Sequence, residues 1–229
     1  MVEARDSSPM AEVTRPRAAI SWSGGKDCCT ALMRSSGSFD FAAMVTMFGE
    51  DGERSRSHGL RPDVIAAQAA RLGLESLTTR CTWQTYTDQY VALLGEVKAR
   101  GMTHVVFGDI MGEPHKAWNE QVCAHHGLVP VMPLWGEPTR LLAEEFIGRG
   151  GEARLVTVRP PLLGQSWLGT SLDAPVLDQF EQLGVDPCGE LGEYHTVVTN
   201  CPLFSSPLEL IPGRQVLSSG CWAMDFTVR

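Results

Sequence analysis

Apolar and polar residues alternate along the chain in blocks that predict strands and helices in turn. Short, continuous apolar runs are typical of buried parallel strands, and they occur at residues 18–21, 41–48, 74–81, 103–107, 128–132 and 153–158. Between them, apolar residues recur at helical spacing over residues 27–34, 62–73, 86–101, 114–126 and 139–147. Strands that alternate with helices predict βαβ units, and therefore an α/β fold with a doubly wound, mostly parallel sheet.

The pattern changes after two adjacent prolines, Pro160 and Pro161. A further helix is expected over residues 173–183, and the remaining segments predict short strands separated by proline and glycine. We therefore expect a flexible N-terminal arm over 1–17, a core domain over 18–159 and a small mixed C-terminal subdomain over 160–229. Within the core, the polar segment 49–61 is a candidate mobile loop.

Composition and charge exclude several classes of protein. Of 229 residues, 43% are apolar and 20% are charged, which argues against a disordered chain. No apolar run reaches the ~18 residues of a transmembrane helix, so no membrane partner is expected. The formal net charge of −8 makes nucleic acid an unlikely partner.

The cysteines point to a reducing compartment. There are seven of them, scattered and without a C-x-x-C pair, which argues against zinc-ribbon and iron–sulfur sites. The N-terminal residues also lack the apolar core of a secretory signal. We therefore expect a cytoplasmic location.

A glycine-rich turn follows the first expected strand and opens the first expected helix. Its sequence over residues 21–28 is SWSGGKDC. In this setting backbone N–H groups converge on an anion and glycines let it approach, so the turn predicts a phosphate site. The spacing fits neither a Walker A loop nor a dinucleotide fingerprint. The alternative is a glycine turn that binds no ligand.

The turn resembles the PP-loop, S-G-G-x-D-S, of N-type ATP pyrophosphatases, which cleave ATP between the α and β phosphates. One position departs, because Cys28 stands where that motif has Ser or Thr. The resemblance implies that ATP and Mg²⁺ are the cofactors, with Asp27 as the metal ligand. The residues expected to bind ATP are Ser21, Ser23, Gly24, Gly25, Lys26, Asp27, Cys28 and, in the polar loop, His58.

Further strings resemble the diphthine–ammonia ligase family. They are the pairs His-Gly at 58–59, Gln-Ala at 68–69 and Leu-Gly at 72–73, then FGDI at 107–110, PLWG at 133–136 with Leu141 and EFI at 145–147, and DPCGELGEYHT at 186–196. On these strings we identify the chain as a member of that family. The resemblance implies a core of the HUP type, the PP-loop ATPase fold, with the C-terminal subdomain on the substrate side. It also implies ATP-dependent amidation of a carboxylate by ammonia, the named acceptor being diphthine on elongation factor 2, with release of AMP and pyrophosphate.

The same resemblance supplies candidate roles for individual residues. The expected catalytic residues are Lys26, Asp109, Glu193 and His195. The expected substrate-binding residues are Trp135, Glu190, Gly192, Glu193 and Thr196. Glu193 or His195 would take the proton that the attacking ammonia must lose. Asn119 stands where the family commonly has Arg, which leaves the acceptor open between diphthine and a related carboxylate. A homodimer is possible.

Other interpretations remain open at this point. The adjacent Cys28 and Cys29 suit a PP-loop sulfur transferase that acts on RNA, and the departure at Cys28 suits a nucleotide-binding protein with reduced catalysis. Asp27 could balance the helix dipole, and Asp109 could cap the next helix. The 186–196 segment could be a solvated turn.

Overall fold

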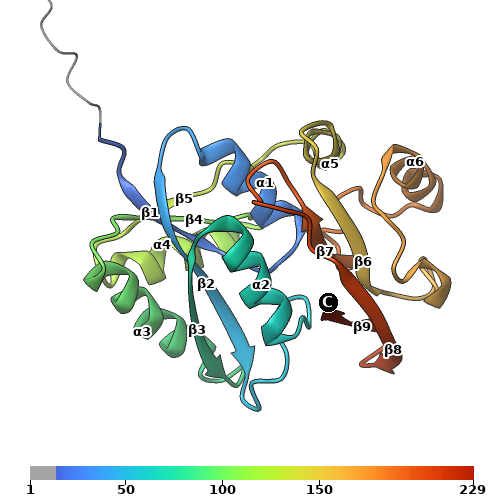
Figure 1. Cartoon of the computed structure of the whole chain (residues 1–229), viewed down its shortest axis with the longest axis horizontal. Helices are drawn as coiled ribbons and strands as arrows, with labels where there is room; N and C mark the ends of the chain where they lie inside the picture. The colour runs from blue at the N-terminus through green and yellow to red at the C-terminus, as the bar shows by residue number, and fades with distance from the viewer. Residues whose placement is uncertain (1–13) are drawn as a thin grey trace, which may run out of the picture.

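Five parallel strands form the central sheet of the protein. The computed structural model describes residues 14–229 and orders these strands β3-β2-β1-β4-β5 (Figure 1). The elements are β1 (Arg17–Ser21), α1 (Lys26–Ser35), β2 (Asp40–Gly49), α2 (Pro62–Leu72), β3 (Glu75–Cys81), α3 (Tyr86–Ala99), β4 (His104–Val106), α4 (Glu113–Ala124), β5 (Val129–Val131) and α5 (Thr139–Gly148). The strand order reverses between β1 and β4, where doubly wound sheets bind ligands. The expected α/β fold class is confirmed.

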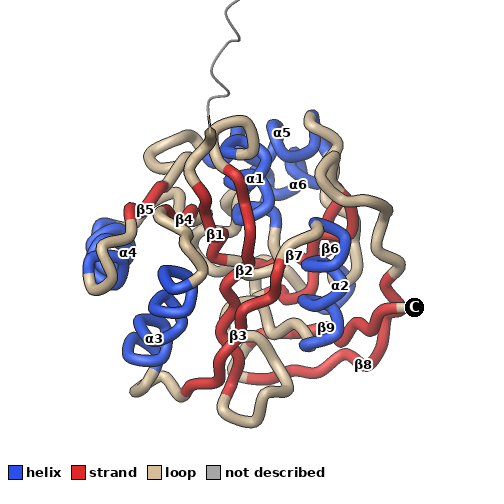
Figure 2. Tube along the Cα trace, turned by 60° about the vertical axis from the view of Figure 1, so that its left-hand side comes forward, coloured by secondary structure: helices blue, strands red, loops and turns tan. Residues whose placement is uncertain are grey.

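The helices cover both faces of this sheet. α1 and α2 pack on one face and share a hydrophobic core with α5 and the C-terminal part of the chain. α3 and α4 pack on the other face around a second core. Figure 2 shows α3 and α4 on one side of the strands and α2 with the C-terminal strands on the other.

The C-terminal part of the chain forms a second, antiparallel sheet with the order β7-β6-β9-β8. Its elements are β6 (Glu152–Val158), the short 3-10 helix η1 (Gln165–Trp167), α6 (Ala174–Leu183), β7 (Tyr194–Asn200), β8 (Leu210–Ser218) and β9 (Cys221–Val228). The sixth expected strand forms as β6, but it pairs with β7 and β9 and does not extend the parallel sheet. A short apolar strand can join either sheet. β6 joins the antiparallel sheet because its partners, β7 and β9, follow later in the chain. A domain division at residue 160 stays a prediction.

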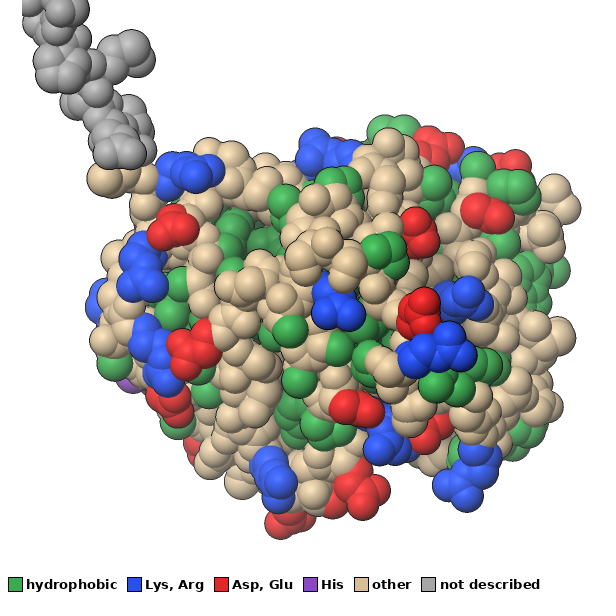
Figure 3. Space-filling view, in the orientation of Figure 1, with side chains coloured by type: hydrophobic (Ala, Val, Ile, Leu, Met, Phe, Trp, Pro, Cys, Tyr) green, Lys and Arg blue, Asp and Glu red, His purple; other side chains and the backbone are tan. Residues whose placement is uncertain are grey.

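Residues 1–13 of the expected arm lie outside the described residues, residues 14–16 have no regular structure, and β1 begins at Arg17. In the part that the structure describes, no helix is long and apolar enough to cross a membrane. Figure 3 shows acidic and basic side chains interspersed on one face, without a broad basic area there.

A buried amide joins the two sheets. The Gln68 side chain donates to the carbonyl oxygens of Gly24, at 3.1 Å, and of Val198 in β7, at 2.9 Å. It accepts a hydrogen bond of 2.8 Å from the indole nitrogen of Trp22. The backbone N–H of Val198 also donates directly to the Gly24 carbonyl at 2.9 Å. β7 is therefore fixed against the turn that follows β1.

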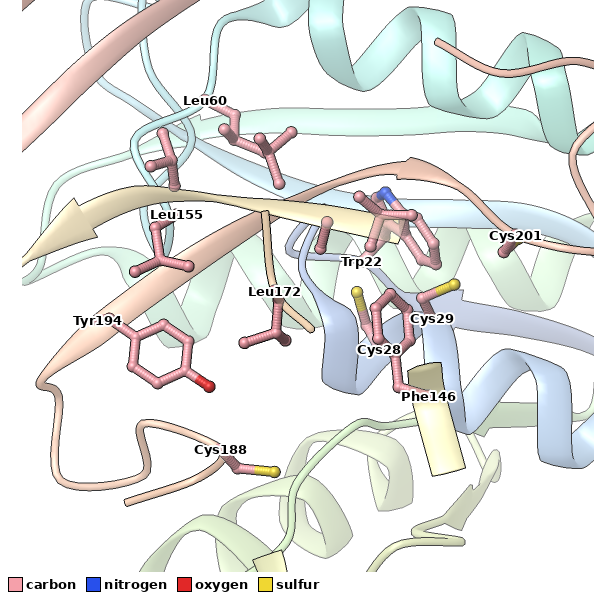
Figure 4. Close-up of a cluster of buried hydrophobic side chains, with 14 of the residues drawn as sticks. Trp22, Cys28, Cys29, Leu60, Phe146, Leu155, Leu172, Cys188, Tyr194 and Cys201 are labelled. Atoms are coloured by element: carbon pink, nitrogen blue, oxygen red, sulfur yellow. The ribbon is translucent and has the colours of Figure 1, made fainter. Parts of the chain in front are cut away.

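The core between the sheets is closed by α5. Figure 4 shows Phe146 of α5 beside Cys28 and Cys29 of α1, and all three side chains are buried. Phe146 is fully buried, and a Cβ atom at Gly151 would come within 2.4 Å of its ring. The ring therefore fills a space with little room for rearrangement.

We expect Phe146→Ala to lower the free energy of unfolding by about 3–5 kcal/mol, because it removes a buried ring and leaves a cavity. Leu141→Ala on the same helix is the matched control, since Leu141 is 56% exposed. It should change stability by no more than about 0.5 kcal/mol. Denaturant unfolding measures both, and equal losses would contradict this packing.

Candidate active site

A cavity of about 340 Å³ lies where the two sheets meet, above the carboxyl ends of β1, β2 and β4. Its wall combines the glycine turn, the loop after β2, the start of α3 and the 188–196 segment. Most residues expected in the site line this one cavity, namely Ser21, Ser23, Lys26, Asp27, Cys28, His58, Asp109, Glu190, Gly192, His195 and Thr196. Segments more than 150 residues apart in the sequence are thus brought together.

The glycine turn accepts no side chain at its two central positions. Gly24 has φ +86°, and a Cβ atom there would lie 2.3 Å from Leu60. A Cβ atom at Gly25 would lie 2.2 Å from the His58 ring. Gly25 precedes the first turn of α1, so the amides at this helix start lie beside the cavity. Such an N-terminus favours an anion.

Lys26 is buried between the turn and the C-terminal segment. Its ammonium donates to the Asp27 carboxylate at 2.8 Å and to the carbonyl oxygen of Cys188. It also lies 5.1 Å from the centroid of the Tyr194 ring. Burial lowers the pKa of Lys26, but the charge of Asp27 and the other neighbours outweighs it, so the pKa is raised above its ordinary value. The ammonium therefore remains charged.

Thr196 and His58 fasten the C-terminal segment over the turn. The Thr196 hydroxyl accepts a hydrogen bond of 3.1 Å from the backbone N–H of Lys26. His58 Nδ1 lies 2.7 Å from the Thr196 carbonyl oxygen, and because a carbonyl can only accept, Nδ1 carries the proton. The polar loop 49–61 is thereby attached to β7.

Two stacked imidazoles line the cavity. The rings of His58 and His195 lie 4.6 Å apart between centroids, with 24° between their planes. Burial lowers the pKa of His58 to about 4 and that of His195 to about 3, and the charge of Lys26 adds to the effect in both. Both rings are therefore neutral at neutral pH, and His195 is a weak proton acceptor there.

Glu193 points away from the cavity and into its own loop. The carboxylate accepts hydrogen bonds from the backbone N–H groups of Asp186, at 3.0 Å, and Leu191, at 3.1 Å. The side chain of Asp186 in turn accepts from the N–H groups of Cys188 and Glu190. Glu193 thus closes the loop that presents the Cys188 carbonyl to Lys26.

Glu190, three residues earlier, lines the cavity. Burial raises the pKa of its carboxyl to about 7, and the negative charge of Asp27 raises it further. A carboxyl that titrates near neutrality can take up or release a proton under working conditions. The two glutamates of one motif therefore have different surroundings, and Glu190 is the one that faces the cavity.

Asp109 lies at the end of β4, on the opposite wall. Asn119 of α4 is buried and donates to its carboxylate at 3.1 Å, while His115 lies 3.6 Å away. The expected substrate contact Trp135 does not line the cavity; Lys116 lies 5.4 Å from its ring centroid. The structure brings Asp109 to the site and leaves Trp135 outside it.

Several residues of the site were not expected from the sequence. Gln68 belongs to one of the motif strings, but the resemblance gave it no role. Its place on the apolar face of α2 beside Ile65 is a further signal that could have found it. Tyr86 and Tyr90 of α3 line the cavity, although their spacing indicated only a buried helix face. Trp22 also lines the cavity, but it is 2% exposed and its indole nitrogen donates to Gln68.

The donor set suits a metal ion that arrives with a nucleotide. Among residues 14–229, no three His, Cys, Asp or Glu side chains are grouped closely enough to hold a metal ion by themselves. Mg²⁺ is commonly bound through one or two carboxylates plus phosphate oxygens. Asp27, which lines the cavity beside the start of α1, fits that mode.

We expect Glu193→Gln to lower the free energy of unfolding by about 1–3 kcal/mol, because the new NH₂ group faces a buried N–H. Glu190→Gln is the control, since it removes a buried charge and should leave stability unchanged or higher. Urea unfolding of both variants at one pH makes the comparison. A larger loss for Glu190→Gln would contradict the roles assigned to the two side chains.

Comparisons with known proteins agree with the sequence motifs. Residues 16–130 match the model of the diphthamide synthase N-terminal domain, and residues 138–225 match that of the diphthamide synthase C-terminal domain. A solved structure, a predicted subunit of tRNA methyltransferase from Methanocaldococcus jannaschii, covers 81% of this chain and 98% of its own at a TM-score of 0.41 and 12% identity. Similarity at that level carries no inference about function.

Three curated relatives are each named diphthine–ammonia ligase. The Schizosaccharomyces pombe protein is 29% identical over 82% of this chain and 35% of its own length. The Rattus norvegicus protein is 26% identical over 89% of this chain and 86% of its own, and the Danio rerio protein is 34% identical over 50% and 47%. The chain thus spans about a third of the yeast relative and most of the rat relative. Because the two domain models together match most of its length, the chain belongs to the diphthamide synthase family.

Proposed function

We propose that the protein is an ATP-dependent amide ligase of the diphthine–ammonia ligase type. It adenylates a carboxylate, either diphthine or a related group, and ammonia then displaces AMP. The observation that carries this proposal is that the glycine turn and the 188–196 segment line one cavity. An anion site and a set of ionisable groups are what this two-step chemistry needs in one place.

The first step is activation of the carboxylate. A carboxylate is a poor acyl donor because oxide is a poor leaving group, and transfer of AMP from ATP replaces it with a good one. In our proposal the phosphates lie at the start of α1, with Lys26 as a fixed positive charge beside them. Asp27 would hold Mg²⁺, which neutralises phosphate charge when it is bound with the nucleotide.

The second step forms the amide. Ammonia attacks the carbonyl carbon of the acyl adenylate, the C–N bond forms, the C–O bond to AMP breaks, and the nitrogen loses a proton. We assign that proton to Glu190, because it lines the cavity and its pKa is about 7. His195 is neutral and weakly basic, so it is better suited to orienting a reactant. Glu193 acts through the shape of its loop.

The acceptor and the setting are part of the same proposal. Diphthine on elongation factor 2 is the acceptor that the names of the relatives suggest, with ammonia as the nitrogen source. All seven cysteines are unpaired, which is consistent with a cytoplasmic location. A homodimer stays a prediction.

Sulfur transfer is a weaker alternative. A sulfur carrier needs an accessible thiolate. Cys28 is 4% exposed and Cys29 is fully buried, and burial raises the pKa of the Cys28 thiol. A nucleotide-binding protein with reduced catalysis differs from the proposed ligase only in turnover, which the product assay decides.

With ATP, an ammonium salt and elongation factor 2 that carries diphthine, we expect AMP and pyrophosphate in equal amounts. The reason is that a PP-loop holds the β and γ phosphates while the α phosphate reacts. Nucleotide chromatography and a pyrophosphate assay measure both products. Formation of ADP and phosphate, or no turnover with any carboxylate, would refute the proposed ligase.

In the same assay, we expect Glu190→Gln to lower kcat for ammonium-dependent AMP release by about 100-fold or more, because it removes the proton acceptor. The Kd for ATP, measured by calorimetry, should stay within about threefold, since no phosphate contact is assigned to this side chain. An unchanged kcat would remove Glu190 from the chemistry.

A further inference from the structure

Arg56 lines the cavity, although it is not among the site residues expected from the sequence. It belongs to the loop after β2, and its backbone N–H donates to the Met47 carbonyl at 2.9 Å, which fixes the start of the side chain. The central guanidinium carbon lies 4.4 Å from the centroid of the Trp83 ring. Trp83 stacks in turn on Tyr86, with 5.8 Å between ring centroids. The guanidinium therefore rests on an aromatic platform beside the opening.

No partner within residues 14–229 neutralises this cation. Arg56 forms no ion pair and no side-chain hydrogen bond there, and its Nε atom is buried without an acceptor. Two other arginines of the same segment are paired, since both Arg54 and Arg61 contact the carboxylate of Asp225. Lys26, the other cation of the cavity, is already bound to Asp27. The guanidinium thus lines the cavity without a counter-charge among the described residues, and an anionic ligand would supply one.

The geometry points to Arg56 as the anion-recognition residue of the cavity, whose guanidinium binds an oxyanion of the ligand. The contact with the Trp83 ring fixes the position of the guanidinium, whose paired N–H donors match the two oxygens of a carboxylate or phosphate. Asp27, Asp109 and Glu190 line the same cavity, and Lys26 beside them is paired with Asp27, so Arg56 adds a positive charge that an anionic ligand can use. The proposed function supplies two oxyanions, the acceptor carboxylate and an ATP phosphate.

Calorimetry of Arg56→Gln shows which oxyanion Arg56 binds. The two ligands tested are Mg-ATP and elongation factor 2 that carries diphthine. We expect the Kd for one of these ligands to rise about 10- to 100-fold, because the substitution removes a charge-assisted pair of hydrogen bonds. A weaker Kd for the acceptor assigns the carboxylate, and a weaker Kd for ATP assigns a phosphate. Both values within twofold of wild type would overturn the proposal.

Arg80→Gln is the matched control, because Arg80 is an exposed cation beside the same loop and does not line the cavity. It should change neither Kd by more than twofold. Arg56→Lys keeps the charge but loses the planar fork, so it should recover part of the affinity and keeps the test valid if Arg56→Gln unfolds. A wild type that binds both ligands but releases no AMP would contradict the proposed function and leave the Arg56 result standing.

Discussion

The side chain of Gln68 is the contact on which the site depends. It is fully buried and satisfies three hydrogen bonds, with the indole of Trp22 and the carbonyls of Gly24 and Val198. A buried amide in such a network is costly to leave unpaired, so the three segments have one low-energy arrangement. The glycine turn, α2 and β7 are consequently held together before any ligand binds. This constraint converts a surface turn into one wall of a cavity.

The loop after β2 depends on the same arrangement. His58 binds Thr196 in β7, and Arg54 binds Asp225 in β9, so contacts at two points attach the loop to the second sheet. A polar segment with glycines suggested a mobile loop, but these contacts come from residues far along the chain. The anchored loop brings Arg56 to the cavity and places the His58 ring against Gly25.

The charged side chains in and around the cavity are of two kinds: some are bound to other groups of the protein, and some are not. Lys26 is held by Asp27 and Cys188, and Glu193 is held by backbone N–H groups, so both side chains are fixed in position. Within residues 14–229, the side chains of Glu190 and Arg56 have no such partners, and both line the cavity. A site of this kind uses its buried ion pairs and hydrogen bonds for position and keeps a few groups for binding and proton transfer.

The sequence by itself determined the alternation of strands and helices, the glycine turn after β1 and the family, because hydrophobic period, glycine spacing and motif strings are local properties. Only the tertiary structure decided that β6 joins the antiparallel sheet, since a short apolar strand carries no mark of its partner. It also distinguished Glu190, which lines the cavity, from Glu193, which does not, although both are glutamates of one motif. Which of two glutamates faces a cavity depends on φ angles and on backbone donors such as those of Asp186 and Leu191, and these are fixed only when the loop packs against Lys26.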